Sequence, residues 1–252
     1  MWLTNQNFMK KIFNLTLILL LTSSLLGFGQ GIQRNSTKAV HASYSAKFGA
    51  LYSQMTPSSD FAIASQKFPD FGNCVLQGAD DFVVTGSGWS LTRIDVVGTS
   101  INSMPANSFE VYIYANNAGL PGALVYSGTS LAYTEAGGVY NITLATPANL
   151  AAGTYWLSVM INANFTPYGQ WYWQPSAAPQ QGNLFVWQDP CDLTASSMTT
   201  FTPMGPFTFA NYDLCFAVYG SSTSSVPVSN WALYFGIFLM VAFVGFRFLK
   251  IK

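Results

Sequence analysis

Short runs of β-favouring residues, separated by turn residues, dominate residues 80 to 220 and constrain the fold most strongly. Within residues 109–115, Phe109, Val111 and Ile113 alternate with Glu110 and two tyrosines, the period of a strand with one buried face. Asn-Asn, Pro-Gly and Gly-Gly pairs between the runs suit turn geometry. We therefore expect an all-β domain, an antiparallel jelly-roll-like β-sandwich, over residues 76–220.

The N-terminal region has the pattern of a secretory signal peptide. Lys10 and Lys11 precede an apolar stretch at 12–26, and small residues follow at 27–31. The sequence predicts a signal peptide over residues 1–31, with Met9 as an alternative start. An uncleaved N-terminal anchor is the other interpretation, and both interpretations place the following domain outside the cytoplasm.

Residues 32–75 are rich in Ser, Ala and Lys and contain the single histidine, His41. We expect an exposed leader that adds at most an edge strand. Between residues 40 and 225, three basic residues stand against all ten acidic ones. Phosphate neutralisation needs clustered Lys and Arg, so this balance argues against nucleic acid as a partner.

The C-terminal region predicts a membrane segment. Residues 221–230 form a Ser-rich linker, and residues 231–249 are nineteen residues in which Arg247 is the only charge. A helix of that length spans a hydrocarbon layer of about 30 Å. The basic tip at 250–252 predicts that the C-terminus is cytoplasmic before any processing.

The order of linker, VPVSNW motif, apolar helix and basic tip resembles the tripartite C-terminal sorting signals of bacterial surface proteins, most closely the PEP-CTERM class processed by exosortases. The resemblance implies a membrane-embedded sorting transpeptidase that cuts near a short motif and transfers the domain to a surface acceptor. That motif consists of Val226, Pro227, Val228, Ser229 and Asn230. A simple single-pass anchor is the alternative.

The central domain is also similar to small β-sandwich modules of bacterial surface and secreted proteins. The similarity rests on ADDFVV at 79–84, YIYANNAGLPGALVYS at 112–127, LAAGTYWLSV at 150–159 and YDLCFAVYG at 212–220. It implies an accessory or adhesive role and transfers no catalytic residue.

Three cysteines allow one disulfide in an oxidising compartment. We expect Cys191 to pair with Cys215, while pairing through Cys74 and three reduced thiols both stay open. The cysteine spacing does not suit a metal, and no cofactor is predicted. Calcium is a weaker hypothesis for Asp80, Asp81 and Asp213, for which solvated acidic turns are the alternative.

Aromatic and amide residues gather between residues 164 and 187. Exposed indoles flanked by amides suit sugar rings, so a glycan could bind at Trp171, Trp173, Trp187, Gln170 and Gln174. The alternative is that these rings fill the core.

Catalysis is not expected, because the single histidine lies in the leader and no carboxylate pair stands out. The sequence thus predicts an exported, non-enzymatic cell-surface protein with a role in matrix, adhesion or glycan contact. A surface glycan-degrading enzyme that uses a carboxylate pair is the alternative.

Overall fold

The computed structural model describes residues 32–33, 49–58, 61–100, 102, 104–177, 181–204, 212–223, 234–235, 237–241 and 243. The predicted signal peptide, the sorting motif from Val226 to Asn230, the basic tip and much of the predicted membrane helix lie outside these residues.

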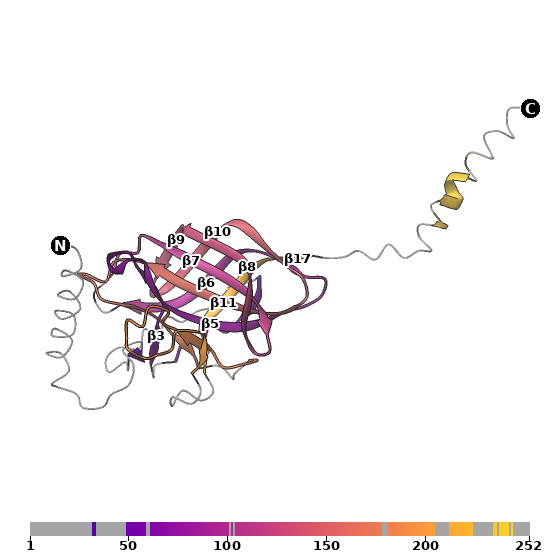
Figure 1. Cartoon of the computed structure of the whole chain (residues 1–252). Coiled ribbons are helices and arrows are strands. Elements are labelled where there is room, and N and C mark those ends of the chain that lie inside the picture. The colour runs from indigo at the N-terminus through magenta and orange to yellow at the C-terminus, as the bar shows by residue number, and fades with distance from the viewer. Residues whose placement is uncertain are drawn as a thin grey trace, which may run out of the picture.

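The described chain is all-β, and two large, mainly antiparallel sheets pack on each other in a sandwich-like arrangement (Figure 1). In one sheet β6 (Trp89–Ser100) is central and pairs with the C-terminal strand β17. The spatial order of this sheet is β1 (Ile32–Gln33), β3 (Ala62–Ala64), β12 (Trp171–Trp173), β6, β10 (Val139–Leu150) and β9 (Tyr133–Ala136), with β17 (Phe216–Ser222) beside β6 and β2 (Ala50–Ser53) beside β17.

The second sheet is built around β5 and β11, which pair directly over part of their length. Its spatial order is β15 (Thr202–Pro203), β14 (Val186–Gln188), β5 (Cys74–Val84), β4 (Gln66–Phe68), β11 (Gly153–Asn162), β7 (Ser108–Asn117) and β8 (Leu120–Leu131). A two-stranded sheet joins β13 (Pro175–Ser176) to β16 (Asp213–Leu214), and a short 3-10 helix, η2, spans Pro69–Phe71.

The alternating pattern at 109–115 is the reason β7 forms a strand with one core face. Phe109, Val111 and Ile113 are fully buried and belong to one apolar cluster that takes residues from both sheets. Glu110, on the opposite face, is only 2% exposed, and its charge is paired with the ammonium group of Lys67, which lies 2.8 Å from its Oε1. The all-β prediction is confirmed.

The prediction of an exposed leader at 32–75 is wrong for residues 61–68. β3 lies between β1 and β12, and β4 lies between β5 and β11, so both are inner strands. Phe61, Ile63 and Phe68 are 0–3% exposed and pack in the main core. The Ser and Ala content of this region suggested solvent exposure, but here small residues allow close packing. The two sheets therefore include β1 to β4, which all precede residue 76.

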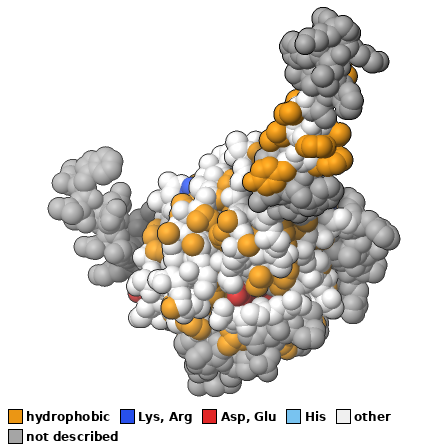
Figure 2. All heavy atoms as spheres, turned by 90° about the vertical axis from the view of Figure 1, so that its right-hand side faces the viewer, with side chains coloured by type: hydrophobic (Ala, Val, Ile, Leu, Met, Phe, Trp, Pro, Cys, Tyr) orange, Lys and Arg blue, Asp and Glu red, His pale blue; other side chains and the backbone are white. Residues whose placement is uncertain are grey.

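The described helical residues near the C-terminus lie apart from the two sheets (Figure 1). Their side chains carry a dense group of exposed apolar atoms (Figure 2). Exposed fractions run from 47% at Ile237 to 69% at Phe243. Within the described residues, no helix combines the length and the apolar character needed to cross a membrane.

Candidate ligand-binding site

The tryptophans predicted to contact a glycan are buried, which corrects that prediction. Trp171 and Trp173 are 0% exposed and Trp187 is 3% exposed. The Nε1 of Trp173 donates to the carbonyl oxygen of Cys215 at 2.8 Å, and that of Trp187 donates to the carbonyl oxygen of Ala64 at 2.9 Å. Their rings are core components because β12, which carries Trp171 and Trp173, and β14, which carries Trp187, are both inner strands. We call these three residues the tryptophan group.

Trp171 packs against Gly98 on the neighbouring strand β6. A Cβ atom at Gly98 would overlap the indole ring, so the absence of a side chain there creates the space for the ring. Phe109 and Tyr140 meet the same ring edge-on, with ring centroids 5.6 and 5.7 Å away. This region is therefore a close-packed aromatic core.

The two glutamines of the predicted glycan site have structural roles as well. Gln174 is 3% exposed, and its Nε2 donates to the carbonyl oxygen of Ser58 at 2.6 Å. Gln170 is half-buried, and its Oε1 accepts a hydrogen bond from the Tyr172 hydroxyl at 2.8 Å. Buried amides of this kind satisfy neighbouring groups and are not presented to a ligand.

The predicted Cys191–Cys215 disulfide is also wrong, because Cys191 is bonded to Cys74 with their Cα atoms 5.9 Å apart. The pairing follows from strand register: Gln188 on β14 lies opposite Gln77 on β5. Continuing this antiparallel register by three residues brings Cys191 opposite Cys74. Cys215 is a free thiol, 0% exposed, inside an apolar cluster.

The three aspartates weighed as calcium ligands do come together, although they are far apart in sequence. Asp80 and Asp81 lie on β5, and Asp213 lies on β16. The carboxylate of Asp80 accepts hydrogen bonds from the Leu214 backbone N–H at 2.6 Å and from Gln54 Nε2 at 2.7 Å. We call Asp80, Asp81 and Asp213 the aspartate cluster.

Each member of the aspartate cluster is at most 2% exposed. Asp81 accepts hydrogen bonds from the backbone N–H and the Nδ2 of Asn183, at 2.9 and 3.0 Å. Asp213 Oδ2 accepts the N–H of Gln181 at 2.6 Å, whereas its Oδ1 is buried without a hydrogen-bond partner among the described residues. No group of three or more His, Cys, Asp or Glu in the described part of the chain is arranged to hold a metal ion.

Burial and mutual repulsion keep protons on this cluster at higher pH than is usual for aspartate. Burial, and then the charge of Asp213, raise the pKa of Asp80 well above its ordinary value. Burial raises the pKa of Asp213 to about 6, and it also raises the pKa of Asp81.

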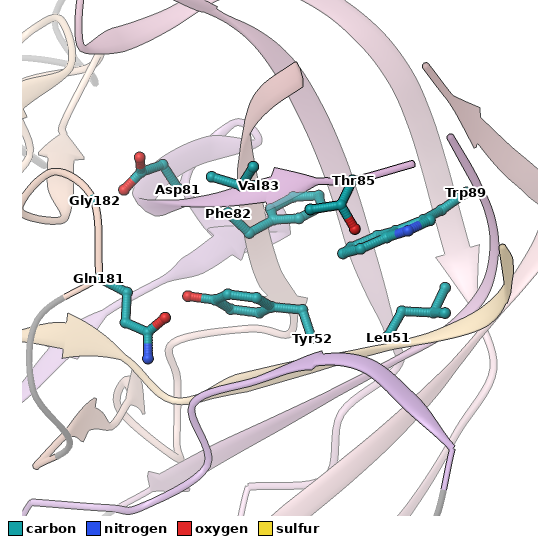
Figure 3. Close-up of a pocket in the computed structure, with 9 residues that line it drawn as sticks. All are labelled: Leu51, Tyr52, Asp81, Phe82, Val83, Thr85, Trp89, Gln181 and Gly182. Atoms are coloured by element: carbon teal, nitrogen blue, oxygen red, sulfur yellow. The ribbon is translucent and has the colours of Figure 1, made fainter. Parts of the chain in front are cut away.

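A pocket of about 390 Å³ opens beside Asp81 (Figure 3). The carboxylate of Asp81 and the amide of Gln181 lie at one end, and the indole of Trp89 lies at the other, with the rings of Tyr52 and Phe82 between them. Val83, 49% exposed, adds an apolar side chain to the wall. The remaining lining residues are Leu51, Thr85 and Gly182.

The floor of the pocket is held by aromatic packing. Phe82 and Trp89 stack with ring centroids 6.3 Å apart and planes 18° apart, and Tyr52 stacks on Phe216 at 5.4 Å. The Tyr52 hydroxyl donates to Gln54 Oε1, the amide whose nitrogen holds Asp80. The pocket and the aspartate cluster are therefore one connected unit, which combines apolar ring faces with hydrogen-bonding groups.

Sequence reasoning found the aspartates of this unit but missed its aromatic wall. Leu51 and Tyr52 fell in the expected leader, and Trp89 begins a strand that resembles several others. Leu51 and Tyr52 could have been located from the pairing of β2 with β17. That pairing joins distant segments and is known only from the structure.

Comparison with known proteins identifies no family for this chain: no family profile matches it, and no curated protein does. Among solved structures, the cysteine protease and lectin-like domains of Cwp84, a surface layer associated protein of Clostridium difficile, align with a TM-score of 0.43 and 16% identity. The alignment covers 64% of this chain and 34% of that one. The chain thus matches about a third of that structure, at a similarity too low to support an argument about function.

Proposed function

We propose that this is an exported, non-enzymatic cell-surface protein whose β-sandwich contacts glycans through the pocket between Tyr52 and Asp81. The pocket carries the proposal because it places ring faces next to hydrogen-bonding groups. Sugars present C–H faces that stack on aromatic rings and hydroxyls that bond to carboxylates and amides. This pocket replaces the buried tryptophan group as the candidate contact site.

Surface placement is supported by the two ends of the sequence. The signal-peptide pattern at 1–31 predicts export, and the apolar run at 231–249 predicts a membrane segment or a sorting signal. The described helical residues in that run are apolar and at least 47% exposed. Burial in a membrane, or removal by a sorting transpeptidase, would relieve this exposure.

A glycan-degrading enzyme is the second candidate, and one observation favours it. Asp213, with a pKa raised to about 6, lies near the pocket, and an acid with such a pKa suits proton transfer at mild pH. However, Asp213 is 1% exposed and does not line the pocket. Glycoside hydrolysis needs two carboxyl groups that flank the bond to be cut. This arrangement supports binding over hydrolysis.

Titration of a panel of neutral, amino and acidic oligosaccharides tests the pocket, with product analysis on the same samples. The proposal expects binding that depends on Tyr52 and no new reducing ends. Release of reducing ends that Asp213→Asn abolishes would favour the enzyme instead. No binding by any member of the panel would reject the glycan proposal.

Mass spectrometry of the C-terminal peptide from protein taken off native cells tests the surface proposal. Loss of residues beyond about Asn230, with added mass on the new end, would establish sorting and identify the acceptor. An intact Lys252 in the membrane fraction would replace sorting with a plain anchor. An intact Lys252 in the soluble fraction would reject both forms of attachment.

A further inference from the structure

We propose that one end of the β-sandwich contacts the lipid surface of the membrane that the apolar C-terminal run enters. This is the end at which the chain leaves the domain after Thr223, and we call it the exit end. It consists of the segments at 85–88, 118–119 and 151–152 together with Thr223. The inference rests on the surface placement in the proposed function and adds the contact that the anchored domain makes.

Strand register brings the segments of the exit end together. Trp89, the first residue of β6, lies opposite Ser222 on β17 and opposite Leu150 on β10. A Cβ atom at Gly88 would lie 2.4 Å from the Leu150 carbonyl oxygen and 3.2 Å from Thr223 Oγ1. β7 ends beside the start of β11, which places the turn between β7 and β8 at the same end.

The chain leaves the domain at a fixed point. The backbone N–H and the Oγ1 of Thr223 both donate to the Gly88 carbonyl oxygen at 2.8 Å, and the Thr223 carbonyl oxygen accepts the Ser87 hydroxyl. Residues 224–230 separate this point from the apolar run that begins at Trp231. A fully extended chain of that length spans at most about 30 Å, so the exit end is the part of the domain held nearest to the membrane.

The exit end carries no exposed charge. The sequence contains no Lys, Arg, Asp or Glu in four long ranges, which include every segment of the exit end: 82–92, 111–134, 136–188 and 214–246. Asp81 is the acid next to this region, and it is 2% exposed. A surface that meets lipid gives up water, and charged groups oppose that step most strongly. The exit end therefore meets a condition for contact with lipid.

The exposed acids lie at the opposite end of the sandwich. Asp70 lies in η2, between β4 and the start of β5. Asp192 follows the cysteine that is bonded to Cys74, the first residue of β5. Glu135 lies in β9 and accepts the N–H of Gly138, in the turn that leads to the far part of β6. The charged surface of the described domain is thus directed away from the exit end.

Exposed apolar side chains gather toward the exit end instead. Outside the C-terminal helical residues, three large apolar side chains of the described domain are exposed, at 47–51%: Val83, Leu124 and Val125. Val83 lies just before the segment at 85–88, and Leu124 lies opposite Tyr114 near the end of β7. Figure 2 faces this end and shows apolar side chains spread over it with few charged atoms among them.

The short linker makes a weak contact sufficient. A neutral surface with a few apolar side chains binds lipid weakly as a separate molecule. Linkage to the membrane turns this contact into an intramolecular event, with an effective concentration in the millimolar range. The pocket shares Val83 and Thr85 with this region, so docking of the exit end would bring the pocket beside the lipid headgroups.

The experiment uses the full chain in dioleoylphosphatidylcholine vesicles that contain headgroup-spin-labelled lipid. Ala152→Cys places a fluorophore at the exit end, and Ala136→Cys is the matched control, an exposed alanine at the opposite end. Cys215 is buried and the other two cysteines are bonded to each other, so a maleimide labels the new thiol. We expect quenching by the lipid at position 152 and retained fluorescence at position 136.

Val83→Asp tests the contact itself, and Thr134→Asp, at an exposed position of β9, is its matched control. Val83→Asp removes apolar area and adds a charge, so quenching at position 152 should fall about fivefold. Thr134→Asp should leave it unchanged. High salt should also leave it unchanged, because the contact contains no charge. Quenching that survives Val83→Asp, or that disappears in high salt, would overturn the inference.

Flotation of the vesicles measures membrane attachment separately. Protein that does not float with the vesicles would reject the proposed attachment and the inference with it. Protein that floats but shows equal quenching at positions 152 and 136 would overturn the docking and leave the attachment intact. Disulfide-linked dimers of unlabelled Ala152→Cys, together with an unquenched label at that position, would assign the exit end to a second copy of the chain and also overturn the inference.

Discussion

Two aromatic groups in this protein differ in what lies beside their rings. The tryptophan group fills the core, and the indole N–H groups of Trp173 and Trp187 bond to backbone carbonyls. Tyr52, which is half-buried, and Trp89, which is 5% exposed, instead line a pocket that also contains Asp81. Aromatic density alone does not distinguish these groups. What differs is the element that packs opposite each ring.

The two groups also differ in the strands that carry them. β12 lies between β3 and β6, so Trp171 has strands on both sides and Gly98 beneath it. β2 pairs only with β17 among the described strands, so Tyr52 has one open side. Tyr52, on an edge strand, is therefore half-buried, whereas Trp89, at the start of the central strand β6, is 5% exposed.

The disulfide next to the tryptophan group should give the largest effect. The Cys74–Cys191 bond joins cysteines 117 residues apart, and a loop of that length predicts a loss of about 5 kcal/mol of unfolding free energy when both cysteines become serine. Urea unfolding measures the loss. Cys215→Ala retains the bond and should cost less, about 1 to 2 kcal/mol. A larger loss in Cys215→Ala than in the double variant would contradict the pairing.

Gly98→Ala should come next, because its methyl group would overlap the Trp171 ring. We expect a loss of about 3 kcal/mol in unfolding free energy, since a buried indole has little room to move. Gly78→Ala is the matched control in β5, where the added carbon would approach nothing closer than 3.4 Å. Its effect should stay within about 1 kcal/mol. Similar effects from both changes would remove the distinction drawn for the tryptophan group.

The aspartate cluster should respond to pH in the direction opposite to a salt-bridged acid. Because the pKa of Asp213 is raised to about 6, the folded chain holds a proton that the unfolded chain releases near its ordinary value of 3.8. The associated stability is present below about pH 4 and is lost as the pH rises through about 6. Thermal unfolding across pH 4 to 8 measures this decline, and a rise in stability over that range would contradict it.

Asparagine variants sharpen the same test. Asp213 uses only Oδ2 as an acceptor, so Asp213→Asn should keep that hydrogen bond and add about 2 kcal/mol of stability at pH 8. Both oxygens of Asp80 accept hydrogen bonds from N–H groups. Asp80→Asn would place an NH2 group against an N–H donor, so we expect a loss of about 1 to 3 kcal/mol in unfolding free energy. Stabilisation by Asp80→Asn and destabilisation by Asp213→Asn would reverse the assignment.

The smallest effect is expected for the pocket residue Tyr52, on the affinity for a glycan. Tyr52→Ala should weaken glycan binding by about tenfold, while Tyr52→Phe retains the ring and should stay within about threefold of wild type. Tyr126→Ala, on β8 at the far edge of the second sheet, should leave affinity unchanged. Calorimetry distinguishes these outcomes, and equal losses from Tyr52→Ala and Tyr126→Ala would indicate a general loss of folding.

Much of the fold was readable from local pattern, and most of the site was not. The alternation around Val111 predicted a strand because a period of two residues is a local property. The Cys74–Cys191 bond depends on the register of β14 against β5, which joins segments more than a hundred residues apart. Asp80 and Asp213 come together because β16 packs beside β5, from which it is more than a hundred residues distant in sequence. The pairing of strands that are distant in sequence therefore could not be predicted from the sequence.

The most direct test follows the indole N–H signals by NMR while an oligosaccharide that binds the protein is added. We expect the Trp89 signal, assigned with Trp89→Phe, to shift on binding. We expect the signals of the tryptophan group, Trp171, Trp173 and Trp187, to stay in place. Shifts in the tryptophan group with an unmoved Trp89 signal would contradict a ligand in the pocket and would place it at the stretch between residues 164 and 187 instead.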